Sequence, residues 1–263
     1  MQKGLLTREQ VIRYLARIKC SFEAEPSLRY LTKLHRQHIY SIPFENLDNF
    51  IGNQVLLDIK KIFEKVVIRR RGGFCFELNG LFHQLLVGLG YQVELVSARV
   101  FHDQNKIGPE FDHMAIVAMV EGQRYLLDVG YGESFRSPKA IVPGLVQMDY
   151  QEYFKIVKNI DENFTLSYSA DCINYSNQYI FDLMPRRLIE FVDMCDFHHR
   201  NKASHLVKKI YIHQTTTTGQ MILTNRQLTI EENGVKSKYA VHNKEEFMVL
   251  LSQHFGLRPK RNA

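Results

Sequence analysis

The hydrophobic pattern of this chain changes its period once, near Tyr91. Before that residue, apolar side chains recur every three or four positions, which is typical of one face of an amphipathic helix. After it, segments rich in Val, Ile, Tyr and Phe alternate with a period of two, which indicates antiparallel strands. The change of period therefore predicts an α+β fold in which a helical first third precedes a β region.

Start and stop signals divide the helical third into four helices. Thr7 with Gln10 forms a capping box, and Ser27 is a candidate N-cap for a second helix. The third helix starts after Asp58 and ends at Gly72-Gly73, and the fourth begins at Cys75 and ends before Gly90. In the β region we expect one helix over 186–196, a last helix capped by Asn243 and Glu246, and strands over 91–100, 113–120, 123–129, 164–169, 177–181, 206–213, 221–230 and 235–241.

Composition narrows the class of protein and of ligand. The 263 residues are 45% hydrophobic and 24% charged, as in a globular protein with a sizeable core, and no run of about 18 apolar residues predicts a membrane span. The net charge of +6 would suit nucleic acid, an anionic membrane or a phosphate-bearing small ligand. The densest basic run has helical spacing and is interpreted as a solvated helix face, so no nucleic-acid partner is expected; it contains Lys60, Lys61, Lys65, Arg69, Arg70 and Arg71.

The cysteine and histidine positions argue against a metal centre. Four cysteines are far apart and form no C-x-x-C pair, which favours reduced thiols in the cytoplasm; they are Cys20, Cys75, Cys172 and Cys195. His35 and His38 are three residues apart on a helix, but no second pair of ligands accompanies them. His198-His199 at a helix end is interpreted as a surface cluster. We expect no metal.

Cys75 is the first candidate for chemistry. It follows Arg71-Gly72-Gly73-Phe74 and lies in the first turn of a predicted helix. There the helix dipole and the free backbone N–H groups favour a thiolate, and the same N–H groups could hold an oxyanion. A small apolar core residue that closes a turn is the alternative interpretation.

A base for this thiol is predicted from the register of one hairpin. If Glu121-Gly122 is a two-residue loop, Val120 pairs with Gln123, and Asp128 then lies diagonal to His113 on one face of the sheet. A three-residue loop would put the two side chains on opposite faces. Cysteine, histidine and carboxylate together predict a Cys-His-Asp triad.

These residues also carry a resemblance to a known family. Five segments, in this order, are similar to the arylamine N-acetyltransferase family: Ile42-Pro43-Phe44-Glu45-Asn46-Leu47-Asp48, Arg71-Gly72-Gly73-Phe74-Cys75-Phe76-Glu77-Leu78-Asn79, Ala98-Arg99-Val100, His113-Met114 and Asp128-Val129-Gly130-Tyr131-Gly132. The match runs from about Tyr14 to Pro138, with weaker similarity through to the final helix. Two departures bear on acceptor preference: Tyr131 stands where Phe is common, and Glu110-Phe111-Asp112 is more acidic and bulkier than usual.

The resemblance implies an architecture that agrees with the periodicity. It consists of an N-terminal helical bundle, a central antiparallel β-barrel and a C-terminal α/β lid around a cysteine-protease-like core. We expect residues 1–90 to form the bundle with the nucleophile, 91–196 the barrel with the histidine and aspartate, and 197–263 the lid.

The resemblance also implies roles for single residues. Cys75 would be the acetylated nucleophile, His113 its base and Asp128 the residue that orients the imidazole. Side chains expected to bind the acceptor are Phe44, Tyr131 and Phe111. Thr217, Thr218 and Gly219 would lie near coenzyme A, and Glu45 with Arg71 would form a structural ion pair.

The predicted activity is a ping-pong transfer of acetyl from acetyl-coenzyme A to an arylamine or arylhydrazine. The partners are then these two small molecules, and the sequence assigns no oligomeric state. Two alternatives remain: a thiol hydrolase or transglutaminase-like enzyme that takes its acyl group from an amide, and a non-catalytic coenzyme A-binding protein.

Overall fold

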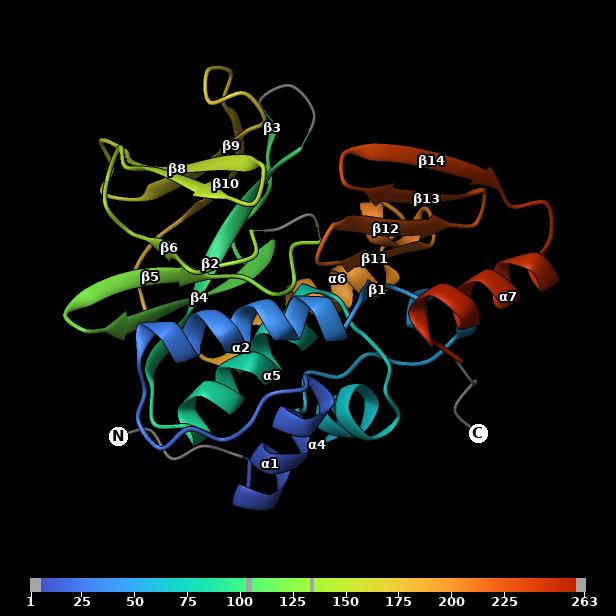
Figure 1. Cartoon of the computed structure of the whole chain (residues 1–263), viewed down its shortest axis with the longest axis horizontal. Coiled ribbons are helices and arrows are strands. Elements are labelled where there is room, and N and C mark those ends of the chain that lie inside the picture. Colours follow the sequence, from blue (N-terminus) through green and yellow to red (C-terminus); the bar gives the residue numbers. More distant parts are fainter. Residues whose placement is uncertain (1–5, 103–105, 133–134, 259–263) are drawn as a thin grey trace.

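Helices gather at one end of the molecule. The computed structural model describes residues 6–102, 106–132 and 135–258, so the outer ends of the first and last predicted units, 1–5 and 259–263, lie outside the described residues. The helices of the first third are α1 (Arg8–Arg17), α2 (Leu28–Ser41), α3 (Asp48–Ile51), α4 (Ile59–Phe63) and α5 (Cys75–Gly88) (Figure 1). The capping box at Thr7 and the N-cap at Ser27 are present as predicted, and Asp58, after which a helix was expected, caps α4.

Helix α5 is the central element of this bundle. A single π-helical turn, η1 (Glu64–Ile68), follows α4, and the chain then turns at Gly72-Gly73 into α5. Most of the α5 side chains are buried, among them Phe76, Leu81 and Leu85. Because the helix packs against the other helices on one side and against the sheet on the other, its first residue is fixed in the interior.

A curled antiparallel sheet forms the middle of the chain. Its strands are β2 (Gln92–His102), β3 (Lys106–Ile107), β4 (His113–Val120), β5 (Gln123–Leu127), β6 (Lys139–Ala140), β7 (Val146–Asp149), β8 (Glu152–Lys158), β9 (Phe164–Ser169) and β10 (Ser176–Phe181). Their order is β6-β5-β4-β2-β10-β9-β8-β7, with β3 paired to β2. The Gln147 side chain of β7 bonds to both the N–H and the carbonyl of Ala140 in β6 at 2.7 and 3.0 Å. This contact joins the two ends of the sheet into a nearly closed barrel.

The predicted register of the β4–β5 hairpin is confirmed. Val120 pairs with Gln123 and Ile116 with Leu127. Glu121 and Gly122 have φ values of 52° and 78°, the left-handed conformation that a tight two-residue turn requires.

A second, smaller sheet completes the chain. It follows η2 (Leu188–Phe191), α6 (Val192–Arg200) and η3 (His205–Val207), and α7 (Lys244–Phe255) packs on it. Its order is β1 (Phe44–Glu45), β11 (Tyr211–Thr215), β12 (Gly219–Thr224), β13 (Gln227–Glu232) and β14 (Val235–Ala240), all antiparallel. The first strand therefore comes from the helical third, and it lies beside β11 in Figure 1.

Several predicted boundaries in this last part are wrong. The strand expected over 206–213 starts only at Tyr211, because the Asn46 side chain bonds to the carbonyls of Leu206 and Lys209 and holds the preceding segment out of the sheet. The strand expected over 221–230 is two strands, since the Thr224 hydroxyl bonds to the N–H groups of residues 226 and 227 and makes a turn there. The helix expected over 186–196 begins as a 3₁₀ turn and ends at residue 200. Strands β7 and β8 were not predicted.

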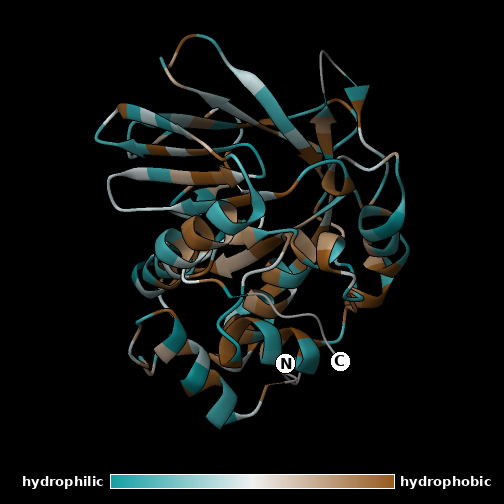
Figure 2. Cartoon of the chain, turned by 90° about the vertical axis from the view of Figure 1, so that its right-hand side faces the viewer, coloured by the Kyte–Doolittle hydropathy of each residue, from teal (hydrophilic) through white to brown (hydrophobic). Residues whose placement is uncertain are grey.

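Several helices have the two-sided character that the periodicity predicts, and Figure 2 shows hydrophobic and hydrophilic residues on the same helices. Helix α5 differs, because most of its side chains are buried. Within the part of the chain that the structure describes, no helix combines the length and apolarity needed to cross a membrane.

Candidate active site

Cys75 is the first residue of α5 and is almost fully buried, with 6% of its surface exposed. The residue before it, Phe74, has an extended backbone that ends the loop. A glycine backs the cysteine: a Cβ on Gly130 would lie 2.7 Å from the Cys75 Cα. Only glycine allows the Asp128–Gly130 segment to approach the start of α5 so closely.

His113 and Asp128 form a direct pair. Nε2 of His113 lies 2.7 Å from Oδ2 of Asp128, and both side chains are buried. The imidazole packs against the rings of Tyr131 and Tyr179, with centroids 5.3 and 5.4 Å away, and these two rings also contact each other at 5.3 Å. Because Nε2 is engaged by the carboxylate, Nδ1 is the nitrogen that can accept a proton.

The second oxygen of Asp128 is held by Asn79, a residue to which the sequence analysis gave no role. The Asn79 side chain of α5 donates to Asp128 Oδ1 at 2.9 Å and accepts from the Val129 N–H at 2.9 Å. The Gly130 N–H donates to the same carboxylate oxygen at 3.0 Å. Burial alone would raise the pKa of Asp128, but the charge of His113 and these hydrogen bonds lower it below the ordinary value. The carboxylate is therefore ionised and fixed.

The expectation that the helix start alone favours a Cys75 thiolate is corrected. Burial raises the pKa of the Cys75 thiol well above its ordinary value, and the charges of Asp128, Cys195 and Asp112 add to this, although the Phe76 N–H opposes it. A lone thiolate is thus disfavoured at this position.

Cys75 and His113 line one pocket with a volume of about 390 Å³. Phe44 and Tyr131, two of the three residues expected to bind the acceptor, line the same pocket. Phe111 packs instead against Phe191 at 5.1 Å and is absent from the described lining. The wall also includes Asn46, Val100, Gln178, Leu206, Lys209 and Tyr211.

The segment expected near coenzyme A is tied to the barrel. Arg136 donates to the carbonyls of Thr217 and Gly219 at 3.4 and 3.1 Å, and the Tyr150 hydroxyl donates to the Thr218 carbonyl at 2.7 Å. Gly219 lines a separate hollow of about 280 Å³, and none of the three residues is among the described lining of the Cys75 pocket.

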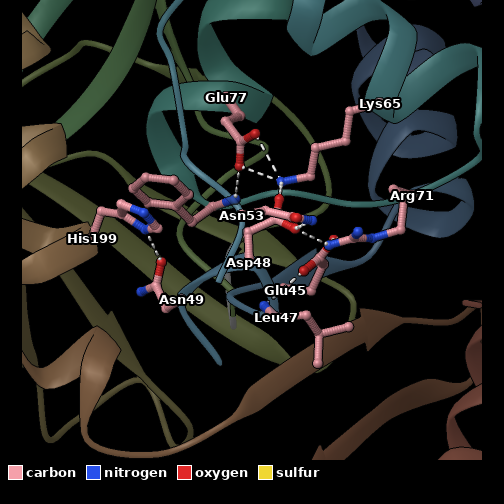
Figure 3. A network of polar contacts seen from close by, with 10 residues as sticks. Glu45, Leu47, Asp48, Asn49, Asn53, Lys65, Arg71, Glu77 and His199 are labelled. Atoms are coloured by element: carbon pink, nitrogen blue, oxygen red, sulfur yellow. Dashed lines mark hydrogen bonds and ion pairs between the residues drawn. The ribbon is translucent and has the colours of Figure 1, made fainter. Parts of the chain in front are cut away.

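Glu45 and Arg71 belong to a buried ionic network. Arg71 lies 2.7 Å from Glu45 and 3.0 Å from Asp48, while Lys65 lies 2.6 Å from Asp48 and 2.8 Å from Glu77 (Figure 3). Glu77 in turn accepts from the Phe74 N–H at 3.2 Å, so the network fixes the loop that carries Cys75. The interpretation of the basic run as a solvated helix face is therefore wrong for Lys65 and Arg71, whose charges pair with carboxylates distant in the sequence.

A second carboxylate–histidine cluster was missed. Asp112 accepts from His102 Nε2 at 2.9 Å and from His198 Nε2 at 3.1 Å, and all three residues line the Cys75 pocket. His198 is buried and bonds through Nδ1 to the Ser204 hydroxyl at 2.9 Å. The interpretation of His198 as a surface residue is wrong, because α6 turns it toward Asp112, 86 residues away.

Neither histidine cluster offers a metal site. Among the described residues, no group of three or more His, Cys, Asp or Glu side chains is arranged to hold a metal ion. His35 and His38 are fully buried, and both rings contact Phe82, His35 edge-on and His38 at a tilt.

A family model and two relatives of known name match most of this chain. Residues 27–263 match the N-acetyltransferase family model. The chain is 31% identical over 233 residues to an arylamine N-acetyltransferase of Escherichia coli, covering 84% of this chain and 79% of that protein. It is 28% identical over 247 residues to proansamycin X synthase of Amycolatopsis mediterranei, covering 91% and 94%.

Solved structures extend the likeness to the fold. The arylamine N-acetyltransferase of Salmonella typhimurium superimposes with a TM-score of 0.90 at 26% identity, covering 96% of this chain and 92% of that one. An arylamine N-acetyltransferase of Bacillus cereus, described as having a Cys-His-Glu catalytic triad, gives 0.87 at 25% identity, covering 96% and 99%. The expected α+β architecture is confirmed.

Proposed function

Because this chain belongs to the arylamine N-acetyltransferase family, we propose that Cys75, His113 and Asp128 carry an acetyl group from acetyl-coenzyme A to an arylamine or arylhydrazine. The observation that carries these roles is the 2.7 Å bond from the buried Asp128 to His113, which lines the same pocket as Cys75. The nucleophile and the base are then available to one bound substrate, and the carboxylate bonds to the base.

The first half-reaction acetylates the enzyme. The Cys75 proton moves to His113 Nδ1 as the sulfur attacks the thioester carbonyl, so that the charge formed is a thiolate–imidazolium pair. The new S–C bond forms, the bond from the acetyl carbon to coenzyme A breaks, and the imidazolium returns its proton to the departing thiolate. The free N–H groups at the start of α5 stabilise the intermediate oxyanion.

The second half-reaction releases the product. The amine nitrogen attacks the acetyl carbon, the bond to Cys75 breaks, and His113 moves the amine proton to the sulfur. An amine must be uncharged to attack, which favours weakly basic aryl amines and hydrazines near pH 7. Phe44 and Tyr131, which line the pocket, would pack against the aryl ring.

Charge and cysteine content support the donor and the compartment. The net charge of +6 suits the phosphates of coenzyme A, and the turn carrying Thr217, Thr218 and Gly219 remains a candidate for its contact. Four cysteines far apart in the sequence support a reduced, cytoplasmic enzyme.

Intact-protein mass spectrometry tests the proposal. The full chain is mixed with acetyl-coenzyme A, with and without an excess of a simple aryl hydrazine, and Cys75→Ser is measured in parallel. We expect one acetyl increment that requires Cys75, disappears on addition of the hydrazine and yields acetylated product.

The variant sets the scale of this test. Cys75→Ser should lose about a thousandfold or more of the transfer rate while its thermal unfolding stays close to that of the wild type. Retention of most of the activity would rule out Cys75 as nucleophile. Acylation by peptide or glutamine amides, with none by the thioester, would favour the amide-donor alternative.

A further inference from the structure

Three successive residues after β5, Asp128, Val129 and Gly130, have backbone N–H groups that bond to side chains and not to a neighbouring strand. The β4–β5 ladder ends at the Ile116–Leu127 pair, so the next residues have no strand partner there. Each of their N–H groups is instead accepted by a side chain. Val129 donates to Asn79 and Gly130 to Asp128, and the Asp128 N–H donates to Nε2 of His35 at 3.2 Å.

His35 is rigidly held below this segment. It belongs to α2 and is fully buried. Its ring stacks on Phe135 with a centroid distance of 5.5 Å and an interplanar angle of 7°, and the edge of Phe82 lies 6.2 Å away. With a helix behind it and an aromatic ring on its face, the imidazole has little freedom to move, so it can fix whatever it bonds to.

The contact identifies the protonation state that the site needs. Nε2 lies 3.2 Å from the Asp128 nitrogen and 3.1 Å from its carbonyl oxygen. An N–H group can only donate, and a buried N–H without an acceptor is rarer in proteins than an under-satisfied carbonyl. The bond to the N–H requires a bare Nε2, with the ring proton on Nδ1. Among the described residues Nδ1 has no partner that meets hydrogen-bond geometry, and the Arg136 backbone is the main-chain group that acts on the ring as a hydrogen-bond partner.

The surroundings keep the ring neutral. Burial lowers the pKa of His35 to about 4, while the Arg136 backbone and the charges of Asp149 and Asp128 oppose this and Lys139 adds to it. A neutral imidazole can accept from the Asp128 N–H, whereas an imidazolium cannot.

We propose that His35 is a positioning residue of the active site, which fixes the main chain of Asp128 and thereby aims its carboxylate at His113. This inference rests on the proposed catalytic role of Asp128. Of the two buried histidines of α2, His35 has this role and His38 does not. His38 is equally buried, but among the described residues neither of its ring nitrogens has a hydrogen-bond partner.

That difference supplies a matched experiment. Glutamine places an amide oxygen near the position of Nε2, whereas asparagine, with the same polar group, is too short to reach the Asp128 N–H. The rate of Cys75 acetylation at saturating acetyl-coenzyme A is measured for wild type, His35→Asn, His35→Gln and His38→Asn, together with the donor KM and thermal unfolding. If His35→Asn does not fold, His35→Met replaces it, since Met fills a similar volume without an acceptor of this kind.

The expected result is a fall of about 10- to 100-fold in the acetylation rate for His35→Asn, with little change in donor KM. His35→Gln should recover most of the rate, and His38→Asn should lose stability but keep its rate. The inference is overturned if His35→Asn stays within about threefold of wild type, or if His38→Asn falls equally. Absence of acetyl-Cys75 in the wild type itself would instead overturn the proposed function, and the inference with it.

Discussion

Two buried aspartates belong to the surroundings of His113, and they are held in different ways. Asp128 receives hydrogen bonds from His113, from the Asn79 amide and from the Gly130 N–H. Asp112, the residue before His113 in the sequence, receives bonds from His102 and His198. Asp128 is thus bonded to an amide and a main-chain N–H as well as to an imidazole, whereas both donors described for Asp112 are imidazoles.

The difference separates a carboxylate held partly by an amide and a main-chain N–H from one held by two imidazoles. Burial would raise the pKa of Asp112, but the hydrogen bonds and charges of His198 and His102 lower it. Asp128 bonds directly to the His113 ring, whereas the contacts described for Asp112 are to His102 and His198. We therefore expect the Asp128 side of His113 to control the rate of the chemistry, and the Asp112 side to adjust the shape and polarity of the pocket.

The largest effect should come from Asp128→Asn. The change preserves the shape of the side chain but removes the charge that stabilises the imidazolium and selects its tautomer. Acetylation of Cys75 should slow by about a thousandfold or more. Rapid-quench measurement of the acetyl-enzyme checks this, and a loss of only a few-fold would remove Asp128 from the mechanism.

Asp112→Asn should have an intermediate effect. It leaves His102 and His198 without their shared charge and loosens one wall of the pocket, but none of its contacts described above is to the His113 ring. We expect kcat/KM for the acceptor to fall about tenfold, with a smaller change in the acetylation step. Steady-state rates with several aryl amines measure the first quantity and rapid quench the second. A loss as large as that of Asp128→Asn would erase the distinction between the two carboxylates.

The smallest effect at neutral pH should come from replacing His83. This histidine bonds to a main-chain carbonyl, whereas His102 and His198 bond to the Asp112 carboxylate. Burial lowers the pKa of His83 to about 4, with a small opposing effect from the Val93 carbonyl. At pH values between about 4 and the unfolded pKa of about 6.5, His83 is protonated in the unfolded chain but not in the folded protein. The stabilisation is thus complete above pH 6.5 and is lost as the pH falls toward 4, by about 1.4 kcal/mol per pH unit.

Urea unfolding between pH 4.5 and 7.5 tests this slope. His83→Gln should reduce the slope by about 1.4 kcal/mol per pH unit below pH 6.5, and change stability least near pH 7.5. His242→Gln is the control, because His242 is exposed and bonds to Glu246. An unchanged slope in His83→Gln would show that this buried imidazole is charged in the folded protein.

Sequence reasoning succeeded where the controlling interactions are local. The pairing of Val120 with Gln123 depends on a two-residue turn, and this register predicted the approach of His113 and Asp128. It failed where partners lie far apart in the sequence. The missed cluster joins β2 and α6 to the residue before β4, and its only signal was an acidic residue unusual at that position.

The burial of individual side chains also could not be predicted from the local sequence pattern. A helix start was taken to favour the Cys75 thiolate, but the depth of α5 in the core reverses the direction of its pKa shift. Lys65 and Arg71 have helical spacing in a basic run, yet their surroundings are set by Asp48, which comes from another segment. In each case the error came from treating a position as exposed that tertiary packing encloses.

The strand β1 carries a consequence for synthesis on the ribosome. Phe44 pairs with His213, which is translated 169 residues later. At about 5 to 20 residues per second, Phe44 and Glu45 emerge roughly 10 to 30 s before their partner strand exists. During that interval the edge beside the nascent bundle is unpaired and open to chaperones or to other chains. The pocket wall that Phe44 contributes is therefore completed only after β11 has been synthesised.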